Sequence, residues 1–560
     1  MTPVLKGFVA VPHGQVHFRY GGSGPVVVML HDSPRSSVLH APNIEWLGEH
    51  FTVIALDTPG YGNSTPLPQP APTIKDFAAA LAVTLSALGI ERCALYGFHT
   101  GAKIALQFAA DHPDRASLTV LDGLALPAET ATAEYLDRYL QPFEPTADGS
   151  YLARQWTRIL DFHRYFPWFT PSAATRMHRP LPDDASLHEY ATDDFMAGPH
   201  WVDAYRAALT YAAGPVIASL GSRTVFMCRE DDVLYGFLDA LPQPLPAHCS
   251  IERIPPHTAL WRTRLLALLK QAALSPAVAW SPPRQSATPG SALEQQRYAN
   301  LIHGQLRVRL RGAPGATPLL LLHDVPGAAS SMGPFAAALS TDRLTILPDL
   351  PGLGESHPLP YPTLGSYVMA LSELLEQLGT PTVDVLAEGL GTCFAIALAA
   401  HRPSQVRRVV LDGVPMIRSR ERRLVARDYC PPIAPDRNGT HLLRIWHQLR
   451  DAEMTWPWFD RAADAARIRD PELDAPQLHA ALVEVMKHLP SYGDASRAAL
   501  EASVRDILRG VHQPVLLFDA AGDTRYSGTG RAARRLPASE VAPRPPDVAD
   551  RIESVRRFLA

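Results

Sequence analysis

A histidine between small residues is the first feature of this chain that could do chemistry. Residues 97–101 read GFHTG, with His99 at the centre. An apolar run precedes them and an Ala-rich helical pattern follows, so we expect a strand, a sharp corner and a helix. A side chain at such a corner is held at a positive φ, which is strained for residues other than glycine. Such strain is kept where the side chain is used, so His99 is the first candidate catalytic residue.

Two further groups that could move protons follow His99 in the chain. Asp231 and Asp232 belong to the sequence REDD after an apolar run, and His257 lies in RIPPHTALW, between an extended and a helical pattern. A carboxylate beside an imidazole fixes the tautomer of the ring and stabilises its charged form. We expect Asp232 to orient His257 in this way, with Asp231 as the alternative acid.

Several roles of His99 remain open. The imidazole could attack a carbonyl as a nucleophile and form an acyl-imidazole that water hydrolyses. It could instead exchange protons with a substrate beside His257, which we favour because this role requires no exact fit to the carbonyl carbon. A core histidine in an inactive fold is a third possibility. Two histidines and a carboxylate could also bind a metal, but no HxH or HxxxH pair supports this, so we expect no metal and no cofactor.

The elements that position these residues occur twice in the chain. The opening GFVAVPHGQVHFRYGGSGPVVVMLHDSP returns later as RYANLIHGQLRVRLRGAPGATPLLLLHDVP, and LDTPGYGNS returns as PDLPGLGES. Such order with few gaps indicates duplication of a whole domain. We predict domains at residues 1–274 and 297–560, joined by a Pro/Ser-rich linker at 275–296.

Short apolar runs alternate with helical patterns in each copy. In the first copy the expected strands are residues 26–30, 53–56, 94–96, 118–121 and 224–228. This alternation predicts an α/β fold, with a doubly wound, mostly parallel sheet in each domain. A long helical stretch before the last of these strands predicts a cap at about 128–212, and its counterpart in the second copy is expected at about 418–505.

These motifs resemble the α/β-hydrolase superfamily over almost the whole chain, twice. The resemblance rests on the turn HDSP at 31–34, the turn DTPGYGNS at 57–64, the corner GFHTG, the acidic turn REDD and the late histidine of RIPPHTALW. The family implies a nucleophile, an acid and a histidine in that chain order, which His99, Asp232 and His257 follow. It also implies Ser, Cys or Asp at the corner, so the histidine there is a departure.

The resemblance also implies where a substrate would be held. Backbone N–H groups of Ser33 and Thr100 should form an oxyanion hole. Asp32 stands beside them where the family usually has glycine, and its charge would repel a developing oxyanion unless the residue only serves the backbone of the turn. The other candidate pocket residues are Phe98 and, in the aromatic cap, Phe162 and His163.

The second copy lacks the groups that could move protons. Gly389 stands at the position of His99, and Arg544 stands at the position of His257. Asp523 keeps the position of the orienting acid but has no imidazole to orient. Glycine also relieves the strain of the corner. We expect an inactive, degenerate second domain that packs against the first as an intrachain pseudo-dimer.

Composition excludes several classes of partner. Lys and Arg number 52 against 56 Asp and Glu, a net charge of −4 without long runs of one sign, so we expect neither nucleic acid nor a membrane surface as a partner. No apolar run approaches the ~18 residues of a membrane span. Five scattered cysteines without CxxC spacing indicate a reducing compartment. We therefore expect a cytoplasmic protein that acts on a small molecule, alone or as a homo-oligomer.

Together these features predict a cofactor-free enzyme that cleaves an ester, a lactone or an activated carbon–carbon bond of a small apolar carbonyl compound. The reaction class follows from the resemblance, and one fold can host many chemistries. The alternatives are a non-catalytic pseudo-hydrolase that binds a ligand or acts as a scaffold, and a non-hydrolytic acid/base lyase.

Overall fold

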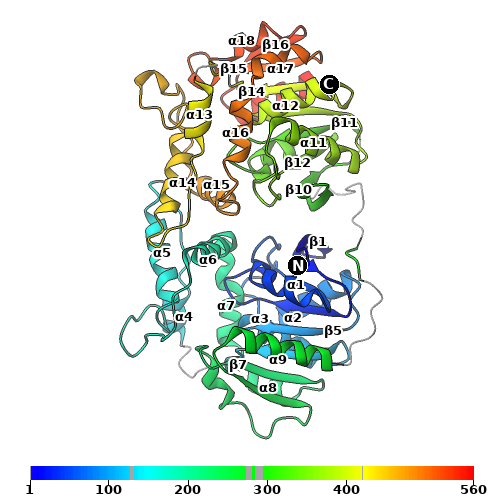
Figure 1. Cartoon of the computed structure of the whole chain (residues 1–560), viewed down its shortest axis with the longest axis vertical. Coiled ribbons are helices and arrows are strands. Elements are labelled where there is room, and N and C mark those ends of the chain that lie inside the picture. Colours follow the sequence, from blue (N-terminus) through cyan, green and yellow to red (C-terminus); the bar gives the residue numbers. More distant parts are fainter. Residues whose placement is uncertain (1, 127–131, 273–279, 284–293, 314, 419–420) are drawn as a thin grey trace. The chain divides into compact units, whose positions relative to one another are not determined.

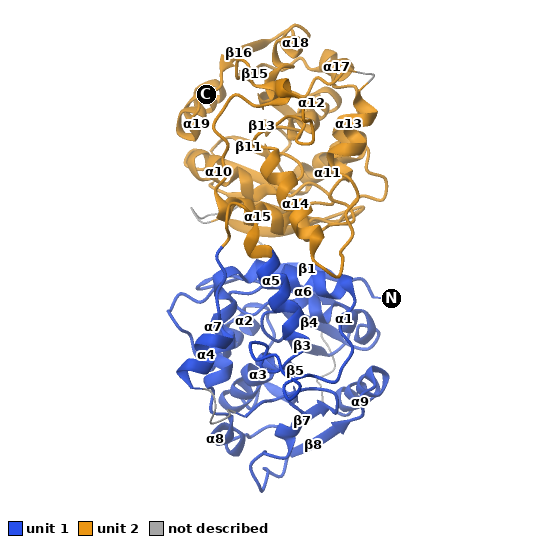
Figure 2. Cartoon of the chain, turned by 90° about the vertical axis from the view of Figure 1, so that its left-hand side faces the viewer, with its two compact units in different colours: residues 1–144, 153–285 blue, residues 145–152, 286–560 orange. Residues whose placement is uncertain are grey.

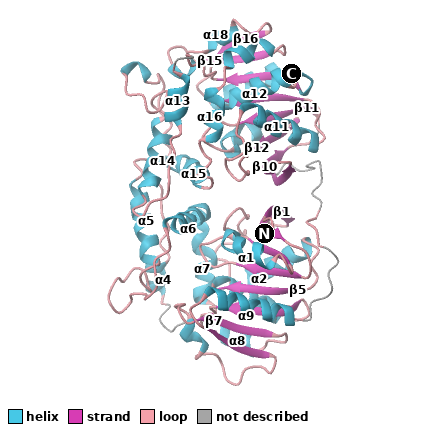
Figure 3. Ribbon diagram, in the orientation of Figure 1, coloured by secondary structure: helices cyan, strands magenta, loops and turns pink. Residues whose placement is uncertain are grey.

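The chain folds into two compact units. The computed structural model describes residues 2–126, 132–272, 280–283, 294–313, 315–418 and 421–560 (Figure 1). The first unit comprises residues 1–144 and 153–285, and the second comprises 145–152 and 286–560 (Figure 2). In its described part each unit contains one eight-stranded sheet with helices around it (Figure 3).

The first sheet is mostly parallel and contains the expected strands. Its members are β1 (Leu5–Val11), β2 (Gly14–Gly21), β3 (Val26–Leu30), β4 (Thr52–Leu56), β5 (Cys93–Phe98), β6 (Ala116–Asp122), β7 (Thr224–Arg229) and β8 (Cys249–Ile254). They are ordered β1-β2-β4-β3-β5-β6-β7-β8. β1, β2 and β4 pair antiparallel, whereas every pairing from β4 through β3 to β8 is parallel. The five strands expected from apolar runs are β3 to β7, so that prediction is confirmed.

The second sheet repeats this topology strand for strand. Its members are β9 (Gln295–Leu301), β10 (Gly304–Arg311), β11 (Ala316–Leu322), β12 (Arg343–Pro348), β13 (Val383–Glu388), β14 (Val406–Asp412), β15 (Val515–Asp519) and β16 (Ser539–Pro543). Read from β9, the order is β9-β10-β12-β11-β13-β14-β15-β16, with the same antiparallel and parallel pairings. The predicted fold class, two tandem α/β folds, is confirmed.

The inner parallel strands are apolar along most of their length because both faces of the sheet are covered there. β4 is buried at every residue, and β3 at all but its first. In the first unit, α2 (Ile74–Ala87) and α3 (Thr100–Asp111) cover one face, while α1 (Ala41–Leu47) and α9 (Thr258–Gln271) cover the other. The second unit has α10 (Gly333–Leu339), α11 (Leu364–Gln377), α12 (Gly391–His401), α18 (Thr529–Ala533) and α19 (Val548–Leu559). Each sheet is thus a packed platform whose carboxyl edge can carry a site.

Helices fill the stretch between the sixth and seventh strands of each sheet, where the caps are expected. The first insertion holds α4 (Ala133–Tyr139), α5 (Ser150–Phe162), α6 (Asp184–Ala197), α7 (Trp201–Thr210) and α8 (Ala213–Ala218). The second holds α13 (Arg422–Tyr429), α14 (Thr440–Asp451), α15 (Ala475–Met486), α16 (Asp494–Glu501) and α17 (Val504–Ile507). Residues 128–131 and 419–420 of the expected caps lie outside the described residues. No helix in the described ranges combines the length and apolarity needed to cross a membrane.

Part of the expected linker is attached to the first unit. Residues 275–279 and 284–293 of the linker lie outside the described residues. Trp280 between them donates its indole N–H to the carbonyl of Leu88 at 2.9 Å, and its ring meets that of Tyr20 edge-on at 5.5 Å. β9 begins at Gln295, within the last residues of the expected linker. One residue of the expected linker, Trp280, is therefore anchored on the first unit.

Replacing Trp280 with Ala should lower the free energy of unfolding of the first unit by about 2 kcal/mol, because a hydrogen bond and partly buried aromatic packing are lost together. Urea unfolding of the full chain, followed by far-UV circular dichroism, measures the change. Ser281→Ala, at the exposed neighbouring position, serves as the control. An unchanged midpoint for Trp280→Ala would show that this contact contributes nothing.

Candidate active site

His99 occupies the sharp corner that the sequence predicts. β5 ends at Phe98 and α3 begins at Thr100, and His99 between them has φ 48° and ψ −104°. Its N–H donates to the carbonyl of Asp122 at 2.9 Å, and its carbonyl accepts from the N–H of Ala102 at 3.0 Å. The positive φ confirms the strained corner. Strain of this kind costs about 1–3 kcal/mol and persists only where surrounding contacts enforce it.

Three glycines leave the space that this corner needs. A Cβ at Gly97 would lie 2.4 Å from the carbonyl oxygen of Gly101, and a Cβ at Gly101 would lie 2.5 Å from that of Leu30. A Cβ at Gly123 would lie 2.5 Å from Cδ2 of the His99 ring. The first two glycines thus let α3 start directly against the sheet, and the third makes room for the imidazole.

The imidazole of His99 is held by a carboxylate and by an aromatic ring. Its Nε2 lies 2.9 Å from Oδ2 of Asp232, and its plane stacks on Phe98 with 4.0 Å between ring centroids. Oδ1 of Asp232 accepts from the N–H of Leu234 at 2.8 Å, so the carboxylate is fixed as well. Nδ1 of His99 has no hydrogen-bond partner in the part of the chain that the structure describes. That nitrogen is therefore left for a water or a substrate.

The two charges of this pair stabilise each other. Burial by itself lowers the pKa of His99, but the carboxylate of Asp232 outweighs this effect and raises the pKa above its ordinary value. Burial likewise opposes ionisation of Asp232, yet the neighbouring imidazole lowers the pKa of this carboxyl to about 2. An imidazolium beside a carboxylate is thus the favoured state at mildly acidic pH, and His99 becomes a base as the pH rises through its raised pKa.

His257 lies apart from this pair, contrary to the expected arrangement. It directly precedes α9, is exposed, and its ring makes no hydrogen bond or ion pair within the described residues. It is not among the residues that line the cavity containing His99. Asp232, expected to orient His257, binds His99 instead. The physical reason is reach: an imidazole at the corner extends further than a serine hydroxyl and meets the acid directly.

Asp231 has a partner of its own. Its carboxylate accepts two hydrogen bonds from Arg229, from Nη2 at 2.5 Å and from Nε at 2.9 Å. These hydrogen bonds lower the pKa of Asp231. Of the two acids that the sequence leaves open, Asp232 is therefore the one that contacts an imidazole.

Ser33 and Thr100 present the two backbone N–H groups expected to form an oxyanion hole. Neither N–H has a hydrogen-bond partner within the described ranges of the chain. The loop that carries Ser33 is held by two contacts. Nε2 of His31 accepts from the N–H of Thr58 at 2.9 Å, and the hydroxyls of Tyr61 and Ser33 are hydrogen-bonded at 2.9 Å. Two free donors are therefore kept on a fixed loop and a helix start, as an oxyanion hole requires.

Asp32 lies in the same cavity with part of its carboxyl unpaired. Its Oδ1 is buried and has no hydrogen-bond partner among the described residues. Burial raises the pKa of Asp32, although the charges of Arg35 and His99 oppose this shift. The neutral form is thus more accessible than in an exposed aspartate, which weakens the repulsion of an oxyanion suggested by the sequence.

A cavity of about 740 Å³ is lined by His99, Asp232, Ser33 and Thr100. The expected pocket residues Phe98, Phe162 and His163 all line it. The helical insertion adds further aromatic side chains, which are Tyr135, Tyr139, Phe166, Tyr190 and Tyr205. Such a lining suits a small, largely apolar molecule with a few polar groups.

Sequence reasoning missed several polar groups of this cavity. The hydroxyls of Tyr139 and Tyr205 lie 2.8 Å apart, and Lys103 donates from Nζ to the carbonyl of Ala208 at 2.6 Å. Burial lowers the pKa of Lys103 to about 8. Arg179 lines the cavity as well. A comparison of the two copies of the chain could have found Lys103, since the second copy has a cysteine at that position.

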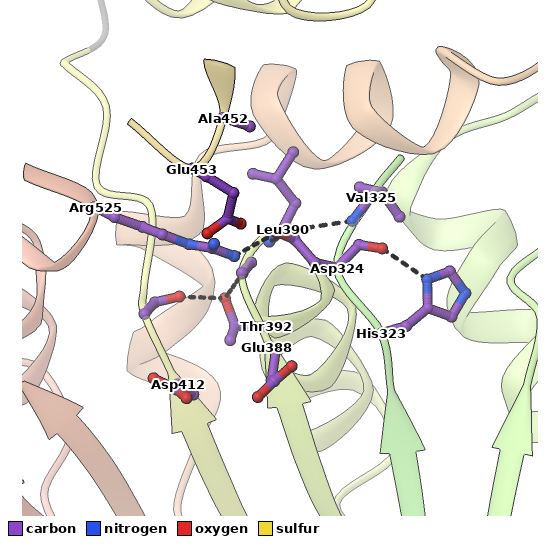
Figure 4. Close-up of polar contacts among 12 residues, drawn as sticks. His323, Asp324, Val325, Glu388, Leu390, Thr392, Asp412, Ala452, Glu453 and Arg525 are labelled. Atoms are coloured by element: carbon purple, nitrogen blue, oxygen red, sulfur yellow. Dashed lines mark hydrogen bonds and ion pairs between the residues drawn. The ribbon is translucent and has the colours of Figure 1, made fainter. Parts of the chain in front are cut away.

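In the second unit the protein's own side chains fill the corresponding corner (Figure 4). Gly389 stands at the corner with φ 54°. Oδ1 of Asp324 accepts from the N–H of Leu390 at 2.7 Å and from the N–H of Val325 at 2.9 Å. These N–H groups are the counterparts of the two free donors in the first unit. The other carboxylate oxygen of Asp324 is paired with Arg525, so a carboxylate of the protein already binds both N–H groups.

A corner side chain and this ion pair exclude each other. A Cβ at Gly389 would lie 1.9 Å from Nη2 of Arg525 and 2.2 Å from Oδ1 of Asp324. In the first unit the side chain of His99 fills the corner, and Leu234 stands at the position of Arg525. The backbone N–H groups are thus unpaired in the first unit and bound to Asp324 in the second, because the corner side chain is missing there and Arg525 holds the carboxylate.

The other second-copy residues singled out in the sequence also bind protein groups. Arg544, at the position of His257, donates from Nε to Asp412 at 2.9 Å. Asp523, at the position of the orienting acid, pairs with Nε of Arg467 at 3.3 Å. The charges of the second site are therefore engaged in internal ion pairs.

Asp232→Asn should lower the pKa of His99 by about 1 unit or more, because the charge that opposes burial is removed. Two-dimensional ¹H–¹⁵N spectra of the imidazole nitrogens, recorded across a pH titration, measure this pKa. Asp231→Asn removes a charge one residue away that is paired with arginine, and should leave the pKa nearly unchanged. Equal shifts in the two variants would contradict the assignment of Asp232 as the partner.

Gly389→Ala should lower the free energy of unfolding of the second unit by roughly 2–4 kcal/mol, since the new Cβ both strains the backbone and displaces a partly buried ion pair. Chemical unfolding of the full chain tests this. Gly365→Ala in α11 is the matched control, because its Cβ would have no neighbour closer than 3.9 Å. Equal stability of the two variants would rule out the close packing around the corner.

Comparison with known proteins places both halves of the chain in one family. The family model of the alpha/beta hydrolase fold matches residues 25–225 and 317–428. A fluoroacetate dehalogenase from Burkholderia sp is 35% identical over 108 residues, which are 18% of this chain and 35% of that protein. A putative carbamate hydrolase, RutD, from Escherichia coli O44:H18 is 38% identical over 97 residues, 17% of this chain and 35% of that protein. These matches thus span about a third of each relative.

Among solved structures, the epoxide hydrolase VrEH1 from Vigna radiata aligns with 48% of this chain and 97% of its own, at 18% identity and a TM-score of 0.39. The family model is the broader match, because it recurs in both units at the strands and helices that carry the corner. Since its two matched ranges together cover more than half of the 560 residues, this chain belongs to the α/β-hydrolase fold family.

Proposed function

We propose that the first unit is a cofactor-free hydrolytic enzyme in which His99, paired with Asp232, transfers the protons. The observation that carries this proposal is the 2.9 Å contact between His99 Nε2 and Asp232 at a strained corner, beside two unpaired backbone N–H groups. A catalytic base must hold its reactive nitrogen free and its other nitrogen fixed. His99 meets both conditions.

The proposed step is the attack of a water on a carbonyl carbon. Nδ1 of His99 takes one proton of the water while the water oxygen bonds to the carbonyl carbon of an ester or a lactone. The carbonyl oxygen becomes an oxyanion and accepts hydrogen bonds from the N–H groups of Ser33 and Thr100. The tetrahedral intermediate then collapses, the bond to the leaving oxygen breaks, and the His99 imidazolium returns its proton to that oxygen. Asp232 stabilises the imidazolium throughout.

A water attack fits His99 better than direct attack by the ring. For direct attack, Nδ1 itself would have to bond to the carbonyl carbon while the carbonyl oxygen stays in the oxyanion hole. A ring nitrogen stands further from the backbone than a serine oxygen, so one position cannot serve both contacts well. A water between Nδ1 and the carbonyl carbon allows His99 to act while the carbonyl oxygen stays at the two N–H groups. The same base could also cleave an activated carbon–carbon bond or remove a proton in a lyase reaction.

The substrate that suits the cavity is a small carbonyl compound with an apolar body. Aromatic side chains of the helical insertion form much of the lining, and about 740 Å³ accommodates a molecule of modest size. The relative named as a putative carbamate hydrolase supports water as the second reactant, because that name describes bond cleavage by water. The five free cysteines fit a reducing, cytoplasmic setting.

The second unit is proposed as a non-catalytic copy that accompanies the first within one chain. Its oxyanion-hole donors are occupied by Asp324, and Gly389 offers no side chain at the corner. A substrate oxygen would have to displace a carboxylate that is paired with Arg525. Such a site can keep the fold of its ancestor while the first unit carries the reaction.

His99→Ala should reduce kcat/KM by at least about 100-fold on any ester or lactone that the protein hydrolyses, because the general base is removed. A panel of chromogenic esters and lactones, assayed with the full chain, provides the measurement. His257→Ala is the matched control and should retain nearly full activity, since that ring is exposed and unpaired. The proposal fails if His257→Ala is the more damaging variant, or if wild type and His99→Ala turn over every accepted substrate equally.

A further inference from the structure

Resting on the proposed function, which makes the first cavity a substrate site, we propose that the substrate carries a carboxylate and that Arg179 binds it. Arg179 lies on the segment between α5 and α6 and is partly buried. Its side chain lines the cavity together with His99 and Asp232. The proposal thus adds an anionic group to the apolar carbonyl compound and names the residue that recognises it.

Arg179 differs from the other arginines of this cavity. Arg35 pairs with Asp193 at 2.8 Å, and Arg229 pairs with Asp231. Arg179 has no ion pair or hydrogen bond within the residues that the structure describes. The charge of Asp232 acts on Arg179 from beyond hydrogen-bond distance. It therefore offsets only part of the cost of desolvating the partly buried guanidinium. A ligand carboxylate would supply a direct partner.

The second unit shows which groups pair with the equivalent arginine when the protein supplies them itself. Arg469 lies 290 residues after Arg179 at the equivalent place, and the matching backbone bridges Tyr165–Arg176 and Thr455–Ala466 fix this correspondence. Arg469 pairs with Glu453 and, at 3.0 Å, with Glu472. The arginine position is therefore built to bind carboxylates.

The first unit keeps this arginine but has lost both of its acids. His163 stands where the second copy has Glu453, and Pro182 stands where it has Glu472. Nε2 of His163 is buried without a hydrogen-bond partner in the described part of the chain. Burial lowers the pKa of His163 to about 4, so its ring is neutral near pH 7. A neutral imidazole can instead donate a hydrogen bond to a ligand carboxylate that takes the place of the glutamate.

The position of Arg179 also suits a group on the substrate of His99. Its charge lowers the pKa of Asp232 and the pKa of His163, so the guanidinium lies near both of these cavity residues. A guanidinium can hold a carboxylate through two parallel hydrogen bonds, which fixes the orientation of the bound molecule. Anchoring one end of the substrate in this way would place its carbonyl reproducibly at the corner.

The test uses phenylacetate and 2-phenylethanol, two probes of similar size of which neither can be hydrolysed. Isothermal titration of the full-length wild-type protein should show phenylacetate binding at least 10-fold more tightly than the alcohol. Arg179→Gln should weaken phenylacetate at least 10-fold and leave the alcohol unchanged. Arg176→Gln, an exposed arginine on the same segment, is the matched control and should change neither affinity.

A second variant imitates the other unit. His163→Glu restores the acid found at position 453, so it should pair with Arg179 and abolish the preference for phenylacetate while the alcohol still binds. Equal affinity of the two probes for wild type, no measurable binding of phenylacetate, or an equal loss in Arg179→Gln and Arg176→Gln would overturn the inference. Because the probes are not substrates, these results are independent of turnover. A phenylacetate site that needs Arg179, found in a protein whose activity ignores His99→Ala, would refute the proposed function and leave this inference standing.

Discussion

The contact between the imidazole of His99 and the carboxylate of Asp232 is the interaction on which the first site depends. It joins the corner after β5 to the turn after β7, and so ties two strands of the sheet at their carboxyl edge. The pair offsets the cost of holding a non-glycine residue at positive φ and of partly burying both charges. It also determines which ring nitrogen remains free. The chemistry that we propose follows from that single orientation.

The two units show two ways of arranging charges around the same backbone. In the second, carboxylates and guanidiniums pair with each other, and Asp324 takes the place that a substrate oxygen would need. In the first, replacements such as His163 for Glu453 remove one member of a pair, and we propose that the remaining Arg179 binds a ligand. Duplication thus provides an internal reference, because charged groups that are paired within the second unit can be compared with unpaired ones in the first. Open charges are costly in a folded protein and are expected where a ligand supplies the partner.

Much of the architecture could be predicted from residue order alone. The repeats, the apolar runs and the glycine-flanked corner led to two tandem sheets and to His99, because periodicity and turn chemistry act locally. The partner of Asp232 could not be predicted, since chain order does not reveal how far a side chain reaches. Sequence order suggested His257 as the partner, but the imidazole of His99 at the corner reaches Asp232 and binds it. The ion pair of Asp324 with Arg525, 201 residues apart, was hidden for the same reason.

The most direct test of the central claim is the tautomer of His99 in the wild-type protein. Nitrogen-15 chemical shifts of its ring, recorded above the raised pKa where the imidazole is neutral, report which nitrogen carries the proton. Our account predicts a proton on Nε2, held toward Asp232, and an unprotonated Nδ1 able to act as a base. A proton on Nδ1, or the mixture of tautomers found for a freely exposed imidazole, would contradict it.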